Sequence, residues 1–169
     1  MKLSEEQKQE LEKIYQEFLN DPRILRMKEI PMHRGSNCYE HSFKVAKLAV
    51  RLAIKHKRLD VKSVLIAAIL HDYYLYDWRK DRSKRKWHGH RHPHLAAQKA
   101  VEDFGVSDLV RKAISSHMWP INILEFPCSV EARILSFSDK IIATREAMTS
   151  KKHKAKRRQS YLEDISHLF

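Results

Sequence analysis

The chain has 169 residues, 43% of them hydrophobic, which is enough for one domain with a sizeable core and unlike a disordered chain. No apolar run reaches about 18 residues and the amino-terminal MKLSEEQKQE is polar, so neither a transmembrane helix nor a secretory signal is expected. The two cysteines, Cys38 and Cys128, are then expected to be free thiols in a reducing cytoplasm. Three glycines and five prolines are too few for a fold of strands and turns, which favours an all-α fold.

Helical periodicity and capping signals predict a single domain, 1–169, of about six to eight helices. Helix-start signals stand at Ser4, Asp21, Asp60 and Ser107, and a stop signal stands at Gly105. The predicted helices cover residues 4–28 in two pieces, about 38–57, about 61–73, about 92–104, about 108–117, 128–149 and part of 150–169. Residues 30–36, 74–90 and the segment MWPINILEFP are predicted loops, and no stretch reads convincingly as a strand.

The net charge of +12 comes from two short stretches. Residues 79–91 hold seven Lys or Arg and one Asp, and residues 151–158 hold six Lys or Arg and no acid, so each stretch carries +6. The rest of the chain is balanced. This distribution suits a phosphate-rich ligand, although a charge run near a terminus is usually only solvated. The role of the tail 151–158 is therefore left open.

Six polar residues lie on the core faces of five predicted helices, where each would be costly to bury alone. They carry imidazole or carboxylate groups at helical spacing from apolar neighbours: His41, His71, Asp72, His92, His117 and Asp139. A single histidine in such a place is usually just hydrogen-bonded within the core. Six are explained more simply by one shared site that coordinates metal. Nitrogen and carboxylate donors without thiolates suit Fe, Mn, Zn, Ni or Co, and argue against a structural zinc site.

The order of these residues resembles that of a known family. His41, the His71-Asp72 pair and Asp139 follow the H…HD…D order of the HD superfamily of metal-dependent phosphohydrolases, in the contexts EHSFKVAKLAV, LIAAILHD and SFSDKI. The resemblance covers about residues 37–147. It implies an HD-type helical bundle with the metal site between helices, one or two divalent transition-metal ions, and catalytic roles for His71 and Asp72.

A subset of this superfamily has two more histidines before the last Asp and binds two metals. HPHLAA offers His92 and AISSHMWP offers His117 for these positions, and the resemblance implies that Asp72 bridges the two ions. Two points stay open. His94 is a register alternative to His92, and His117 follows Ser116 where the subset often has two adjacent histidines.

The segment after the His-Asp pair departs from the family. Many relatives continue with a small or apolar residue, Gly and a Lys near the phosphate, whereas this chain continues Tyr73-Tyr74-Leu75 and lacks the Lys. We expect part of the basic loop that follows to supply the missing charge, with a merely solvated loop as the alternative. The candidate substrate-binding residues are Trp78, Arg79, Lys80 and His88, of which the tryptophan could stack on a base.

The resemblance implies hydrolysis of a phosphoester or phosphoanhydride by a metal-bound hydroxide. A nucleotide or dinucleoside polyphosphate is the expected substrate, because family members with this histidine pattern cut dinucleoside polyphosphates or cyclic dinucleotides. Three alternatives remain: a cyclic (di)nucleotide phosphodiesterase, although the extended GYP-type signature is missing; a di-iron oxygenase on the same fold; and a nucleic-acid-binding protein with a structural metal. No Gly-rich phosphate loop is present, so ATP-driven chemistry is not expected. The oligomeric state is left open.

Overall fold

The computed structural model describes residues 3–32, 36–56, 58–77 and 88–148, together with Ile165 and Leu168. Some of the predictions above fall outside these residues: those for Trp78, Arg79, Lys80 and the basic tail 151–158. They stay predictions, as does the single domain.

Seven α-helices and one 3-10 helix are described within these ranges. In chain order they are α1 (Glu5–Asn20), α2 (Pro22–Leu25), the 3-10 helix η1 (Arg26–Glu29), α3 (Cys38–Ala53), α4 (Val61–Leu70), α6 (His88–Phe104), α7 (Asp108–Ser116) and α8 (Val130–Met148). In the described part of the chain, β pairing is limited to one isolated bridge between Pro31 and Asn37. The predicted all-α class is confirmed.

Local capping sets the helix ends that the sequence predicts. The Ser4 hydroxyl accepts the amide N–H of Gln7, and the Gln7 side chain accepts the amide N–H of Ser4, which completes the capping box of α1. Asp60 and Ser107 each accept a backbone amide in the first turn of α4 and α7. Gly105 follows α6 with a φ of +60°, a left-handed conformation that glycine adopts without steric cost.

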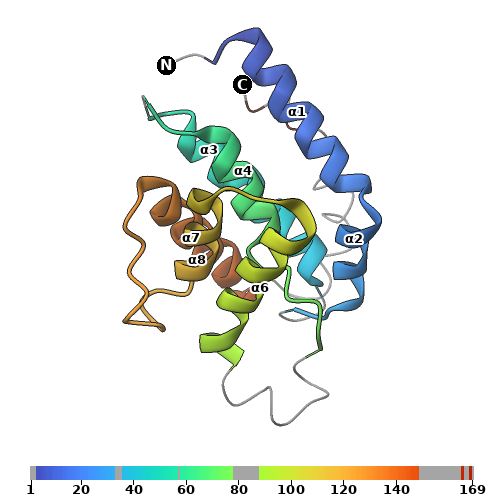
Figure 1. The fold of residues 1–169 in the computed structure, drawn as a ribbon, viewed down its shortest axis with the longest axis vertical. Coiled ribbons are helices and arrows are strands. Elements are labelled where there is room, and N and C mark those ends of the chain that lie inside the picture. The colour runs from blue at the N-terminus through green and yellow to red at the C-terminus, as the bar shows by residue number, and fades with distance from the viewer. Residues whose placement is uncertain are drawn as a thin grey trace.

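α4 lies at the centre of the bundle (Figure 1). It packs against α3 and contacts α7 and α8, while α8 also crosses α3 and α6 pairs with α7. Eight of its ten residues are buried, as expected for a helix that is apolar on all sides. The carboxyl end of α4 therefore lies inside the molecule, and the His71-Asp72 pair follows directly after it.

Three helix boundaries differ from the prediction by about one turn. α3 ends at Ala53 and not near residue 57. α4 ends at Leu70, so the His-Asp pair lies in the turn that follows and not in the last helical turn. α6 begins at His88, one turn before the predicted start. The later start was predicted because apolar periodicity is lacking in the histidine-rich stretch before it. Pro93 lies inside α6.

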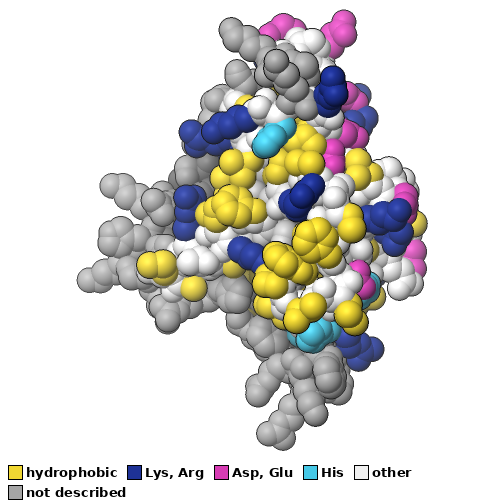
Figure 2. Space-filling view, turned by 90° about the vertical axis from the view of Figure 1, so that its left-hand side faces the viewer, with side chains coloured by type: hydrophobic (Ala, Val, Ile, Leu, Met, Phe, Trp, Pro, Cys, Tyr) yellow, Lys and Arg dark blue, Asp and Glu magenta, His cyan; other side chains and the backbone are white. Residues whose placement is uncertain are grey.

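No helix in the described part of the chain is long and apolar enough to span a bilayer. Exposed hydrophobic side chains gather on the segment that connects α7 to α8, where Ile123 is 75% and Leu124 93% exposed. Figure 2 looks onto the side of the molecule where α7 and α8 lie in Figure 1 and shows hydrophobic side chains clustered there, with Lys and Arg among them. This is a denser gathering than the single apolar residues normally scattered over a protein surface.

Candidate metal centre

Five segments bring the six predicted side chains together. His41 comes from the first turn of α3 and Asp139 from the middle of α8. His71 and His117 are the C-cap residues of α4 and α7, so both stand where a central helix ends. Asp72 directly follows His71, and His92 comes from the amino-terminal half of α6. All six side chains are buried, although aspartate is almost never fully buried without a partner.

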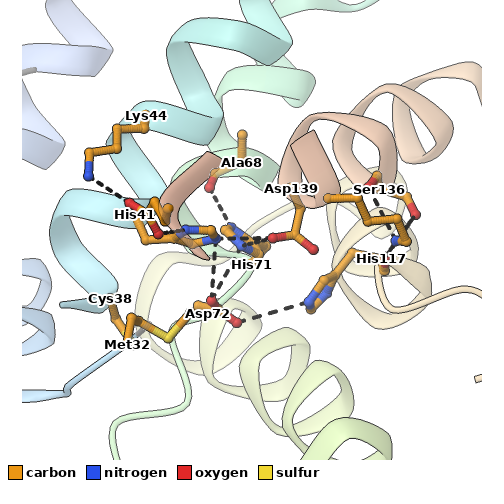
Figure 3. Close-up of polar contacts among 12 residues, drawn as sticks. Met32, Cys38, His41, Lys44, Ala68, His71, Asp72, His117, Ser136 and Asp139 are labelled. Carbon is orange, nitrogen blue, oxygen red and sulfur yellow. Dashed lines mark hydrogen bonds and ion pairs between the residues drawn. The ribbon is translucent and has the colours of Figure 1, made fainter. Parts of the chain in front are cut away.

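Asp72 lies between His41 and His71 on one side and His117 on the other (Figure 3), and His92 approaches it on the side of His117. Its Oδ2 is 3.4 Å from His71 Nε2 and 4.0 Å from His41 Nε2. Its Oδ1 is 3.4 Å from His92 Nε2 and 4.0 Å from His117 Nε2. One carboxylate thus offers a different oxygen to each pair of imidazoles, which is the arrangement a ligand shared by two ions requires.

Asp139 completes the side of the site formed by α3 and α4. Its Oδ1 is 3.0 Å from His41 Nε2 and 3.7 Å from His71 Nε2. Three overlapping groups of side chains could each hold an ion, because the donor atoms within a group lie within 4.8 Å of one another. The groups are His41, His71 and Asp72; His71, His117 and Asp139; and Asp72, His92 and His117. Each group has the number and type of donors that could hold a metal ion.

Hydrogen bonds at Nδ1 to backbone carbonyls fix the orientation of three of the four imidazoles. Nδ1 of His71, His92 and His117 lies 2.7–2.8 Å from the carbonyl oxygens of Ala68, His88 and Ile114, respectively. Because a carbonyl only accepts, each Nδ1 carries the proton and each Nε2 keeps its lone pair. The Nε2 atoms are the ones that point into the site, as ligating histidines require.

These donors fit a cation in two further respects. His71 Nε2 is buried and has no hydrogen-bond partner among the described residues. His92 Nε2 and His117 Nε2 lie 3.1 Å apart, and with both protons on Nδ1 two lone pairs face each other. Burying imidazole nitrogens that accept no hydrogen bond costs free energy unless another group binds their lone pairs. A divalent ion would satisfy all three nitrogens, with Asp72 and Asp139 to offset its charge.

The electrostatics divide the histidines into two kinds. Burial alone lowers the pKa of His41, but hydrogen bonds to Asp139 and Glu146 outweigh it and raise that pKa to about 10. Burial, helped by the neighbouring His71 and His92, lowers the pKa of His117 to about 3. Burial raises the pKa of Asp139, yet the hydrogen bond with His41 and the charge of the nearby His71 bring that pKa well below the usual value. The carboxylates are therefore ionised at neutral pH.

Burial favours His92 over His94 as the candidate ligand. His92 is 4% exposed and its Nε2 faces Asp72, whereas the His94 side chain is 51% exposed and lies 3.5 Å from Glu125 on the surface. His94 is thus not placed to be a ligand. His88, predicted to touch substrate, stacks on the His92 ring with centroids 4.6 Å apart and is hydrogen-bonded to the Tyr76 hydroxyl at 2.8 Å. Whether it contacts substrate stays a prediction.

The residues in place of the usual Gly and Lys are packed inward. The Tyr74 side chain is buried, its hydroxyl 3.3 Å from Cys38 Sγ, and its ring lies edge-on to His92 at 5.5 Å. Leu75 has a left-handed backbone with a φ of 52° and packs against the core. Neither side chain offers a cation to a phosphate, so nothing at these two positions takes the place of the family Lys.

Two groups of residues around the ligands were not predicted from the sequence. Glu146 is hydrogen-bonded to His41 Nδ1 at 3.0 Å and paired with Lys44 at 2.6 Å. Ser136 and Lys140 both donate to the carbonyl oxygen of His117, at 2.8 and 2.9 Å. A signal for the first existed, because Glu146 lies seven residues after Asp139, two helical turns along the same face. The second had none, since it joins side chains to a backbone oxygen.

Comparison with known proteins agrees with this geometry. The family model of the HD domain matches residues 38–144, which contain all six side chains. The chain belongs to the HD domain family. Members of this family are generally metal-dependent phosphohydrolases and bind divalent metals. No curated protein and no solved structure matches the chain, so the comparison identifies the HD domain without naming a substrate.

Proposed function

We propose that this HD domain protein is a metal-dependent phosphohydrolase that cleaves a phosphoester or phosphoanhydride bond in a nucleotide or dinucleoside polyphosphate. The observation that carries the proposal is the convergence of four histidine Nε2 atoms and two carboxylates in one buried site. Asp72 Oδ1 and Oδ2 face different histidine pairs, and this favours two ions over one.

In this proposal, His41, His71, Asp72 and Asp139 hold one ion, and Asp72, His92 and His117 hold the other. Bound divalent ions would neutralise phosphate charge and acidify a water, so no serine or cysteine nucleophile is needed. The second group has only three protein ligands, which leaves room for substrate or solvent oxygen. The protein's own part is to keep the carboxylates of Asp72 and Asp139 ionised and to direct the Nε2 atoms of the histidines into the site.

The expected substrate rests on charge and aromatic side chains beside the site. His88 and Tyr76 lie next to His92, where α6 begins. The basic stretch 79–91 overlaps this start, and Arg79 and Lys80 are proposed to replace the missing family Lys. Trp78 is proposed to stack on a base. A phosphate-containing small molecule fits these groups better than a nucleic acid does, since nothing in the sequence resembles a nucleic-acid recognition module.

The experiment that tests the proposal combines metal analysis with a nucleotide panel. The purified protein is analysed for bound metals, reloaded with Fe²⁺, Mn²⁺ or Zn²⁺, and assayed against mononucleotides, diadenosine polyphosphates and cyclic dinucleotides. His92→Ala should abolish turnover, whereas His94→Ala, two residues away on the same helix but exposed, should keep it. Equal activity of both variants would refute the ligand assignment.

The same panel distinguishes the alternatives. Release of phosphate or of a shorter nucleotide without oxygen supports hydrolysis. Oxygen-dependent loss of substrate without phosphate release would instead support a di-iron oxygenase. Tight binding of RNA or DNA that weakens steeply with salt, in a protein without turnover, would favour the nucleic-acid-binding alternative.

A further inference from the structure

The imidazole of His41 is held differently from the other three of the candidate metal centre. Nδ1 of His71, His92 and His117 is bonded to a backbone carbonyl within the same helix or its last turn. Nδ1 of His41 is instead bonded to a side chain of another helix, the carboxylate of Glu146 at 3.0 Å. Of the four Nδ1 hydrogen bonds, only that of His41 can therefore be removed by substituting the partner residue.

The Glu146 carboxylate is buried, 6% exposed, and both of its oxygens are occupied. Oε2 accepts from His41 Nδ1 and, at 3.3 Å, from the Ser36 hydroxyl. Oε1 accepts from Lys44 Nζ at 2.6 Å, an ion pair marked by the dashed line from Lys44 in Figure 3. Because Lys44 offsets the negative charge, the carboxylate can remain ionised when His41 is neutral, the form in which an imidazole binds metal.

A simple ion pair between α3 and α8 would not need a histidine. Here Asp139 approaches Nε2 of His41 and Glu146 approaches Nδ1, each at 3.0 Å. Both acids come from the same face of α8, two turns apart. One helix thus contacts both nitrogens of the ring and leaves it no freedom to flip.

We propose that Glu146 is a positioning residue of the metal centre. With an ion bound, it would hold His41 as the Nδ1–H tautomer, so that Nε2 can bind the ion beside Asp72 and Asp139. This inference rests on the proposed function, in that His41 is taken to be a metal ligand. Loss of such an outer partner typically weakens metal binding about 10–100-fold, because the ligand loses both orientation and basicity.

The test uses Glu146→Gln, which keeps the shape of the side chain and removes its charge. Mn²⁺ and Zn²⁺ affinities are measured by competition with a fluorescent chelator, and the ring protons of His41 are observed by NMR in the zinc-loaded, ¹⁵N-histidine-labelled protein. We expect affinity to fall about 10–100-fold and the Nδ1 proton of His41 to shift or exchange faster. Glu131→Gln removes a charge from the first turn of the same helix and should change neither result.

Metal affinity within twofold of wild type, with an unmoved His41 Nδ1 proton, would show that Glu146 only stabilises the fold and would overturn the inference. Should Glu146→Gln fail to fold, the wild-type spectrum decides, because a His41 ring protonated on Nε2 contradicts the proposed tautomer. A wild-type protein that binds neither ion would refute the metal-dependent function as well. Normal metal binding without turnover of any nucleotide would contradict only the proposed substrate.

Discussion

Two residues other than glycine have a left-handed backbone, Arg58 with a φ of 75° and Leu75 with a φ of 52°. This conformation costs an L-residue roughly 1–2 kcal/mol because Cβ crowds the following carbonyl oxygen. Leu75 packs against the core three residues after Asp72, so contacts offset its strain. Arg58 is exposed between α3 and α4, where the described structure gives it no such packing.

Arg58→Gly is therefore expected to stabilise the protein by about 0.5–1 kcal/mol, the relief of strain less the greater freedom of glycine in the unfolded chain. Urea denaturation would show this as a higher midpoint with an unchanged slope. Arg58→Ala keeps Cβ and should give no comparable gain. A similar gain in the alanine variant would mean that loss of the charge, and not of the strain, is responsible.

Arg79 and Lys80 are the residues at which the proposed phosphate contact is tested. Replacing either with Ala should raise the KM for the nucleotide roughly tenfold, since a charged hydrogen bond contributes about 1.5 kcal/mol, while metal content stays unchanged. Steady-state kinetics with the substrate found in the panel provide the measurement. Lys13→Ala, an exposed charge on α1, serves as the control. Unaltered KM values would show that the loop is only solvated.

At the scale of elements, α7 and α8 are joined at the end of α7. The Ser136 hydroxyl and the Lys140 ammonium from α8 donate to the His117 carbonyl, and Lys140 also donates to the Ser136 hydroxyl at 2.8 Å. A C-terminal carbonyl of a helix has no partner within that helix, so these donors satisfy it. They also fix where His117 enters the metal centre.

Ser136→Ala should destabilise the protein by about 1 kcal/mol and weaken metal binding, because the end of α7 loses a donor. Chemical denaturation and metal titration give the two values. Ser138→Ala is the matched control on the same helix, since the Ser138 hydroxyl is buried and has no partner among the described residues. Its removal should be neutral or slightly stabilising. Equal losses in both variants would point to packing and not to the hydrogen bond.

At the scale of the whole molecule, the candidate metal centre joins α3, α6, α8 and the ends of α4 and α7. An ion that binds only the folded chain stabilises it by about 2.7 kcal/mol when its concentration is 100 times the Kd. For a chain of this size, such a change corresponds to a rise in Tm of roughly 5–10 °C.

We therefore expect excess Mn²⁺ to raise Tm and a chelator to reverse the rise, as followed by calorimetry. Asp72→Asn keeps the size of the side chain but removes the charge shared by both histidine pairs, so its Tm should hardly respond to the ion. Metal analysis of this variant is the second measurement. Two bound ions per chain in Asp72→Asn would contradict the bridging role of Asp72.

Local signals predicted the helices well because they act within one or two turns. The capping box of Ser4 and Gln7 and the glycine stop at Gly105 form as expected. The start of α6 was predicted late because the inward face of its first turns carries His88 and His92 in place of apolar side chains, so no apolar periodicity marks them. Periodicity reports the polarity of a helix's surroundings, which here are set by residues far away in the chain.

The sequence by itself determined the all-α class, the H…HD…D order of the HD family and the six polar residues on core faces, since residue type and helical spacing are local properties. Only the tertiary structure decided which neighbours those residues meet. It buried His92 and left His94 at the surface, turned the two oxygens of Asp72 toward different histidine pairs, and set Glu146 against His41. The reason is geometric: spacing fixes the face of a helix, whereas the packing of one helix on another fixes what that face touches.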